Sequence, residues 1–139
     1  MATKIRDLMT TDPIVCDTST TAAEAARRMR DSDVGDVLVE EDGTLRGIVT
    51  DRDIALRVVA DGTDGDEITI GEICSGDLVT VSPDDDLGDA VNVLREHHVR
   101  RVPVVEDGNA IGVLSIGDLA VTLDPDSALA DISAAPENN

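Results

Sequence analysis

The sequence predicts an α+β fold built from two tandem copies of one β-α-β-β-α unit, packed with pseudo-two-fold symmetry. The first observation is an internal repeat: Gly47 and Asp53 recur as Gly112 and Asp118, each 65 positions later, and the copies align without a gap. The second is that both copies show the same succession of strand-like and helix-like patterns. One copy alone would expose the apolar faces of a small sheet, whereas two stacked copies can bury them.

Each copy contains the same elements in the same order, with an EDG turn between its two central strands. The first copy is expected to form a strand at 13–17, a helix at 21–30, strands at 37–39 and 46–50, and a helix at 53–60. The second copy is expected to form a strand at 78–82, a helix at 87–94, strands at 102–105 and 111–115, and a helix at 118–123.

The first helix of each copy is predicted from its apolar spacing and from its capping residues. Apolar residues fall at i, i+3, i+4 and i+7 in both helices, which places them on one face: Ala22, Ala25, Ala26 and Met29, and then Leu87, Ala90, Val91 and Leu94. Thr21 with Glu24 has the spacing of a capping box, and Asp86 is expected to cap the second helix.

The repeats set the expected domain boundaries. The first repeat should span 4–60 and the second 68–123. Residues 61–67, rich in Gly and Asp, are expected to be a linker. The tail, 124–139, is expected to be loose after some helical character.

Composition limits the partners. The chain has 139 residues, of which 41% are hydrophobic and none is aromatic, so any flat ligand must pack on aliphatic side chains or backbone. The formal net charge of -19 argues against nucleic acid and against anionic membrane surfaces as partners. Lys4 is the only lysine. An Asp-rich, Lys-poor chain is compatible with a high-salt cytoplasm, where counter-ions screen self-repulsion, and equally with a high-GC codon bias.

The sequence also bears on location and redox state. It shows no secretory signal pattern, and no apolar run approaches the roughly 20 residues that a membrane span needs, so we expect a soluble, cytoplasmic protein. Cys16 and Cys74 do not form a CxxC motif, and we expect both to be reduced, small buried residues.

One short motif occurs twice and carries the functional interpretation. The first copy is GIVTDRDIA (47–55), and the second is GVLSIGDLA (112–120). Thr50 with Asp53, and Ser115 with Asp118, have the spacing of a helix-capping box. The same hydroxyl and carboxylate could also face a bound sugar-phosphate, and the spacing alone leaves both interpretations open.

With these motifs in place, the chain resembles the CBS domain, and the tandem copies resemble a CBS pair, or Bateman module, here without an effector domain. The resemblance rests on the element order, on the strand VRRVPVVEDG and on the repeated G-x-x-[ST]-x-x-D-[IL] element, and it covers roughly 5–123. It implies two clefts between the repeats that bind AMP, ADP or ATP, with NAD or S-adenosylmethionine possible. It also implies a homodimer and regulation of an unknown protein partner, with no cofactor required.

The resemblance assigns roles to residues of this chain. Asp53 and Asp118 would hold the ribose hydroxyls, with Thr50 and Ser115 beside them. The segments that would frame the base are Ile14 and Val15 with Val34 and Gly35, and Val79 and Thr80 with Val99 and Arg100. Arg101, with Arg100 next to it, would hold phosphate in the second repeat.

The two clefts are expected to differ. The positions of Arg100 and Arg101 are occupied by Gly35 and Asp36 in the first repeat, and an acid would repel phosphate. Arg52 is a possible substitute. We therefore expect a phosphorylated ligand in the cleft of Ser115, Asp118 and Arg101, and regard that of Thr50, Asp53 and Arg52 as the weaker site.

The chemistry of these groups agrees with a nucleotide site. A carboxylate accepts hydrogen bonds from two vicinal hydroxyls at once, as a ribose diol presents them. The N–H groups at a helix start favour phosphate. The alternatives are that the motifs only cap helices and that Arg100 and Arg101 only pair with neighbouring acids on the surface.

Catalysis and metal binding find little support. The sequence has no nucleophile elbow, Walker loop, GxGxxG or HExxH motif, so we do not expect an enzyme. His97 and His98 are expected to be polar residues near a helix end rather than metal ligands. A second hypothesis remains beside the nucleotide sensor: a dimeric structural or stress-response module that binds no nucleotide, which Asp36 favours locally.

Overall fold

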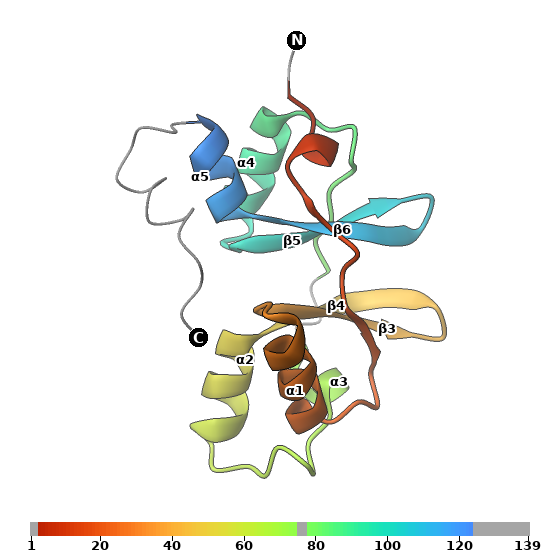
Figure 1. Cartoon of the computed structure of the whole chain (residues 1–139), viewed down its shortest axis with the longest axis vertical. Coiled ribbons are helices and arrows are strands. Elements are labelled where there is room, and N and C mark those ends of the chain that lie inside the picture. The colour runs from red at the N-terminus through yellow and green to blue at the C-terminus, as the bar shows by residue number, and fades with distance from the viewer. Residues whose placement is uncertain (1–2, 75–77, 124–139) are drawn as a thin grey trace. The chain divides into compact units, whose positions relative to one another are not determined.

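The computed structural model describes residues 3–74 and 78–123, and within them it shows the predicted α+β architecture with two repeats (Figure 1). The chain forms two compact units. The continuous unit is Pro13–Leu78, and the split unit combines Met1–Asp12 with Val79–Asn139. The predicted tail at 124–139 lies outside the described residues.

The continuous unit contains a three-stranded sheet in the order β2-β3-β4, with β2 parallel and β4 antiparallel to β3. Its elements are β2 (Val15–Asp17), α1 (Ala22–Ser32), β3 (Asp36–Glu41), β4 (Thr44–Thr50), α2 (Asp51–Ile54), the π-helix η2 (Ala55–Val59) and α3 (Ile70–Ile73).

The split unit contains a three-stranded antiparallel sheet in the order β1-β6-β5. Its elements are the 3-10 helix η1 (Ile5–Asp7), β1 (Thr10–Thr11), α4 (Leu87–Glu96), β5 (Arg101–Glu106), β6 (Asn109–Ser115) and α5 (Ile116–Leu123).

The two cores use matching positions, as the apolar spacing predicts. In the continuous unit, α1 buries Ala22, Ala25 and Met29 against Val37 and Val39 of β3. In the split unit, the equivalent positions are Ala90 and Leu94 of α4, and Val102 and Val104 of β5. Because side chains alternate across a strand, the buried Leu38 between Val37 and Val39 points to the other face of its sheet.

The predicted helix caps form. Thr21 Oγ1 accepts from the amide of Glu24 at 3.1 Å, and Asp86 Oδ1 accepts from the amide of Asp89 at 3.0 Å. Each bond satisfies one amide that the first turn of the helix leaves without an intrahelical partner. A full capping box also requires the Glu24 side chain to accept from the amide of Thr21, and α1 lacks this bond.

The compact units do not begin and end where the sequence repeats do. Ile5 lies in the core of the split unit with Leu94, and its amide donates to Asp85 O at 3.1 Å. The equivalent Ile70 lies in the core of the continuous unit, and its amide donates to Thr20 O at 2.8 Å. Each unit therefore contains residues of both repeats. The boundaries 4–60, 61–67 and 68–123 refer to the sequence repeats and stay a prediction.

The strand predicted at 78–82 does not form, in contrast to its counterpart β2. Val81 makes only an isolated parallel bridge with Val104. In the continuous unit, Leu38 donates to Ile14 O at 2.8 Å and Thr18 donates to Glu40 O at 3.0 Å, which extends the ladder at both ends. Pro103 and Pro83 occupy the positions of Leu38 and Thr18 in the second repeat, and proline has no N–H to donate.

The helix predicted at 53–60 also differs from the structure. It begins at Asp51, directly after β4, and changes from α to π geometry at Ala55. The amide of Ala60 donates to Ala55 O at 2.9 Å, five residues back. Its counterpart α5 is an α-helix throughout. The short elements η1, β1 and α3 are not among the predicted ones.

Candidate functional site

The motif at Thr50 forms a complete capping box at the junction of β4 and α2. Thr50 Oγ1 accepts from the amide of Asp53 at 3.1 Å, and Asp53 Oδ2 accepts from the amide of Thr50 at 2.9 Å. Both side chains are partly buried. The capping interpretation is therefore confirmed for the first repeat.

The second copy of the motif has the same local geometry at the junction of β6 and α5. Ser115 Oγ accepts from the amide of Asp118 at 3.2 Å, and Asp118 Oδ2 accepts from the amide of Ser115 at 2.9 Å. In each copy one carboxylate oxygen is engaged by the backbone at the partly buried start of a helix. A ribose role for these carboxylates is compatible with this geometry and stays a prediction.

Asp36 and Arg101 occupy equivalent positions in the two repeats, and the strand register places each beside the hydroxyl of its motif. Asp36 lies directly opposite Thr50 in the β3–β4 pair, and Arg101 lies directly opposite Ser115 in the β5–β6 pair. Directly opposed residues of antiparallel strands project on the same face with Cβ atoms about 5 Å apart. Each hydroxyl therefore has a charged neighbour, negative in the continuous unit and positive in the split unit.

In each unit, one of the two predicted base-framing segments is hydrogen-bonded to the same helix start. Gly35 O accepts from the amide of Asp51 at 2.9 Å, and Arg100 O accepts from the amide of Ile116 at 2.8 Å. Val34 and Val99 lie directly before these residues and are partly buried. The turn before β3 and the start of α2 thus form one local structure, and the turn before β5 and the start of α5 form the same structure in the split unit.

The remaining predicted residues of the continuous unit lie at the same end of its sheet. Val15 pairs with Leu38 in the parallel β2–β3 ladder, and Ile14 O accepts from the amide of Leu38. Both residues are therefore close to Asp36, where β3 begins. Arg52 is exposed on the first turn of α2. In the split unit, Val79 packs against the core and Thr80 is exposed.

The strand register is the part of the site that sequence reasoning missed. The EDG turns predict the two hairpins but not this register, because a one-residue irregularity in each hairpin shifts the pairing. With Glu41 opposite Thr44, counting back along both strands, past an irregularity after Val39, leads to Asp36 opposite Thr50. The same count in the second hairpin leads to Arg101 opposite Ser115.

His97 and His98 lie at the end of α4, as predicted. His97 is the C-cap residue, and His98 has a left-handed backbone conformation with φ of 53°, which ends the helix. Both side chains are exposed. Within 3–74 and 78–123, no group of three or more His, Cys, Asp or Glu side chains is arranged to hold a metal ion. In the same ranges, no helix is long and apolar enough to cross a membrane.

Comparison with known proteins identifies both repeats. The model of the family described as CBS domain matches residues 5–60 and again residues 70–125. The CBS domain-containing protein YhcV of Bacillus subtilis is 41% identical over 117 residues, which cover 84% of this chain and 83% of that protein. Hypoxic response protein 1 of Mycobacterium tuberculosis is 33% identical over 119 residues, which cover 85% of this chain and 83% of that protein.

Solved structures show the same fold. The crystal structure of Hypoxic Response Protein I with two coordinated zinc ions matches with a TM-score of 0.74 and 32% identity, over 86% of this chain and 98% of that one. The CBS domain pair of protein MJ0100, in complex with 5′-methylthioadenosine and S-adenosyl-L-methionine, matches with a TM-score of 0.80 over 91% of this chain and all (100%) of that one. Its identity of 22% supports a likeness of fold.

Proposed function

The chain belongs to the CBS-domain family, and on that basis we propose that it is a regulatory module that binds adenosine-containing ligands of the AMP, ADP and ATP class. The ligand would bind in clefts formed by the two repeats, and its presence would be passed to a partner protein. NAD and S-adenosylmethionine belong to the same chemical class. We propose no catalytic activity, because CBS pairs act as a class by regulating other proteins.

The observation that carries this proposal is the repetition of one local structure. Both repeats place a hydroxyl and a carboxylate, at a helix start, beside the turn that precedes β3 or β5. A carboxylate can accept from both hydroxyls of a ribose, and a helix start favours phosphate. The complex of the MJ0100 pair supports the proposal further, because it is a case in which this fold holds adenosyl ligands.

We propose that phosphate binds on the side of Ser115. Arg101 lies across the strand pair from Ser115, whereas Asp36 lies across from Thr50. A guanidinium forms charge-assisted hydrogen bonds with phosphate, and a carboxylate repels it. The two half-sites should therefore differ in preference, with phosphorylated ligands at Ser115 and Asp118.

Calorimetric titration of the whole chain tests the proposal. Adenosine, AMP, ATP, NAD and S-adenosylmethionine would be titrated into wild type and Arg101→Gln, in high salt because the chain is acidic. Arg101→Gln should weaken ATP about tenfold, the loss of one charge-assisted contact, with adenosine unchanged. Asp36→Asn is the matched control at the equivalent position and should not weaken ATP. No heat and no thermal shift with any ligand would refute the proposal.

A second candidate function is a nucleotide-free structural or stress-response module. Asp36 favours it locally, because the carboxylate lies where a phosphate contact would be needed. Mass spectrometry of small molecules that copurify with the chain distinguishes the two functions. A nucleotide in the purified protein supports the sensor, whereas its absence, together with an Asp118→Ala variant that matches wild type in every ligand assay, supports the structural module.

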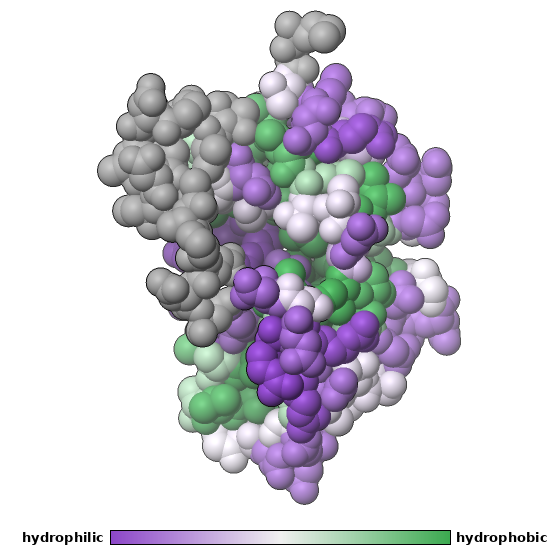
Figure 2. All heavy atoms as spheres, in the orientation of Figure 1, coloured by the Kyte–Doolittle hydropathy of each residue, from purple (hydrophilic) through white to green (hydrophobic). Residues whose placement is uncertain are grey.

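We also propose that two copies of the chain associate through the helix that begins at α2. Leu56 and Val59 are 52% and 71% exposed, and Figure 2 shows apolar surface over this helix. From Ile54 to Ala60 the chain has no acidic residue although its net charge is -19, so two copies repel least there. Light scattering should give a dimer for wild type and a monomer for the Leu56→Ser, Val59→Ser double variant. A monomeric wild type would exclude the dimer.

A further inference from the structure

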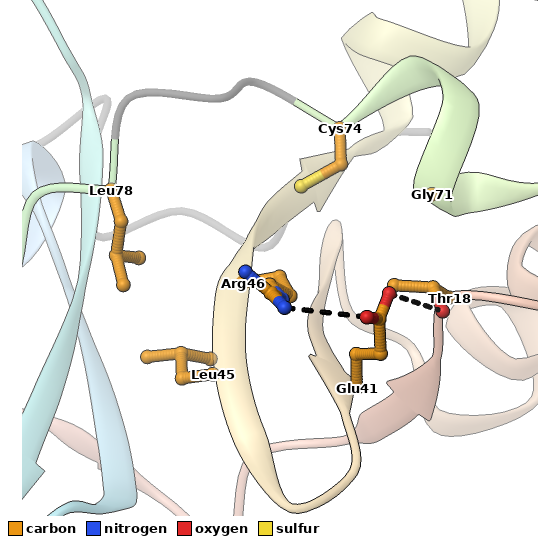
Figure 3. A pocket seen from close by; sticks show the side chains of 7 residues that line it. All are labelled: Thr18, Glu41, Leu45, Arg46, Gly71, Cys74 and Leu78. Atoms are coloured by element: carbon orange, nitrogen blue, oxygen red, sulfur yellow. Dashed lines mark hydrogen bonds and ion pairs between the residues drawn. The ribbon is translucent and has the colours of Figure 1, made fainter.

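The continuous unit contains a cavity of about 390 Å³ at the hairpin end of its sheet (Figure 3). Glu41 is the last residue of β3, and the ribose motif lies beside the first residue of that strand, Asp36. At about 3.3 Å per residue, the two places are roughly 16 Å apart along the strand. The cavity is therefore separate from the candidate nucleotide site. Its lining residues are Thr18, Glu41, Leu45, Arg46, Gly71, Cys74 and Leu78.

The carboxylate of Glu41 is the acidic group of the cavity wall. Its Oε1 accepts from Arg46 Nη2 at 3.2 Å, and its Oε2 accepts from Thr18 Oγ1 at 3.4 Å (Figure 3). The side chains of Arg46 and Glu41 are 55% and 47% exposed. An ion pair this open to water contributes little, so a ligand can displace Arg46 at small cost. Leu45 and Leu78 provide apolar surface.

The matching place in the split unit is filled by the chain itself. Glu106, the last residue of β5, accepts from Arg6 Nη2 at 2.7 Å. Arg6 and Gly71 are equivalent, because the amide of Arg6 donates to Pro83 O at 2.9 Å and that of Gly71 donates to Thr18 O at 3.0 Å. In the continuous unit Gly71 has no side chain to pair with Glu41, and Arg46 of β4 pairs with it instead.

Two further differences leave the space open. Met9 packs against the core of the split unit, and its equivalent in the continuous unit is the shorter Cys74. The chain cannot fill the space from Gly71, because a Cβ atom there would lie 2.9 Å from Thr18 Cβ and 2.9 Å from Thr18 O. The cavity is therefore a consequence of how closely α3 approaches Thr18.

We propose that this cavity binds a ligand with an alkyl guanidinium group, whose cation takes the place on Glu41 that Arg6 takes on Glu106. The alkyl chain would lie against Leu45 and Leu78, as the stem of an arginine would. The net charge of -19 attracts cations and disfavours anionic ligands. A planar guanidinium matches both oxygens of a carboxylate, which a compact ammonium does not.

Titration of the whole chain with n-butylguanidinium, followed by NMR of the backbone amides, tests this proposal. Saturable shifts should occur at Thr18, Glu41 and Gly71. Glu41→Gln should weaken binding by up to about fivefold, because the ion pair that it removes is open to water. Glu106→Gln is the matched control in the split unit and should leave the affinity unchanged. Both carboxylates are exposed or nearly so, hence both variants should fold.

A second variant tests the cavity rather than the charge. Cys74→Met introduces the side chain that the split unit has at the equivalent position, Met9. It should lower the affinity for butylguanidinium, because the longer side chain occupies the cavity. The proposal is overturned if butylguanidinium does not bind, if 1-butanol binds equally well, or if Glu41→Gln binds as wild type does. Nucleotide binding is measured on the same samples, so the failure of one proposal leaves the other tested separately.

Discussion

At the scale of single residues, Asp118 combines a structural role with a proposed ligand role. Its Oδ2 accepts from the amide of Ser115 at 2.9 Å, which stabilises the start of α5. Asp118→Asn keeps an oxygen for this bond but loses the charge that would bind a ribose diol. We expect AMP binding to weaken at least about tenfold, while the free energy of unfolding falls by less than about 1 kcal/mol.

The comparison with Asp118→Ala separates the two roles. Alanine removes the cap as well, so unfolding should become easier by about 1 kcal/mol, measured by urea denaturation. Calorimetry with AMP gives the ligand effect on the same proteins. If Asp118→Asn binds AMP like wild type, the carboxylate is a cap and the ribose role is wrong.

Cys16 gives a prediction about pH. Its side chain is 3% exposed, and Arg28 Nη1 donates to its Sγ at 3.4 Å. Burial raises the pKa of the Cys16 thiol, and Arg28 opposes this with a smaller effect. The unfolded chain therefore loses the thiol proton at lower pH than the folded chain. As pH rises above the ordinary thiol pKa of about 8.5, the free energy of unfolding should fall.

Urea denaturation between about pH 7 and 10 measures this effect. Cys16→Ala should flatten part of the decline, although it lowers stability at neutral pH. Burial also raises the pKa of Cys74, so Cys74→Ala should remove another part. If the free energy of unfolding falls with pH equally in wild type and in both variants, neither thiol contributes to the decline.

At the scale of elements, the pairing of β1 with β6 depends on Gly112. A Cβ atom there would lie 2.7 Å from Thr10 O and 2.8 Å from Met9 Sδ. Gly112→Ala should therefore push β1 away from β6 and lower the free energy of unfolding by about 1–3 kcal/mol. Hydrogen exchange should increase in peptides that contain Thr10 and Thr11.

Gly88 provides a control with the opposite sign. It lies in α4, and a Cβ atom there would come no closer than 3.4 Å to Asp86 Oδ1. Gly88→Ala should raise the free energy of unfolding by about 0.5–1 kcal/mol, because alanine favours a helix. If Gly112→Ala is as stable as wild type, the close approach of β1 does not limit that position.

The elements also show which features a single sequence can predict. The spacing of Ala22, Ala25 and Met29 predicts the buried face of α1, because helix periodicity is a local property. The apolar pattern at 78–82 predicts a strand, but only a bridge at Val81 forms, because Pro103 on the neighbouring strand and Pro83 have no N–H to extend the ladder. Ile5 of the first repeat lies in the core of the split unit, and Ile70 of the second repeat lies in the core of the continuous unit. This arrangement is also non-local, and the repeat pattern does not indicate it.

At the scale of the whole molecule, the parts of the candidate site that depend only on residues close in the sequence could be predicted. The capping boxes at Thr50 and Ser115 follow from spacing alone, and the structure confirms them. The neighbours of these hydroxyls depend on strand register, which the hairpin turns and a one-residue irregularity in each hairpin determine together. The cavity at Glu41 depends on how closely two segments approach, and that distance is absent from any sequence pattern.

The charge of the whole chain gives the last prediction. A formal charge of -19 on 139 residues makes the folded state repel itself, and Figure 2 shows hydrophilic residues over much of one face. The ion pairs within the described part of the chain, such as Arg6 with Glu106 and Arg27 with Glu24, have exposed side chains and contribute little. Salt should therefore relieve more repulsion than it weakens attraction, and the melting temperature should rise with KCl.

The way the melting temperature changes with salt concentration distinguishes screening of charge repulsion from exclusion of salt from the surface. The Debye length falls from about 10 Å at 0.1 M to about 3 Å at 1 M, so a gain from screening should level off near 1 M. A melting temperature that keeps rising beyond that point indicates exclusion of salt from the surface instead. A chain adapted to a high-salt cytoplasm should in addition lose its folded state at low salt, whereas one that is acidic through codon bias should stay folded. A melting temperature that is flat or falls between 0.1 and 1 M would contradict self-repulsion as a limit on stability.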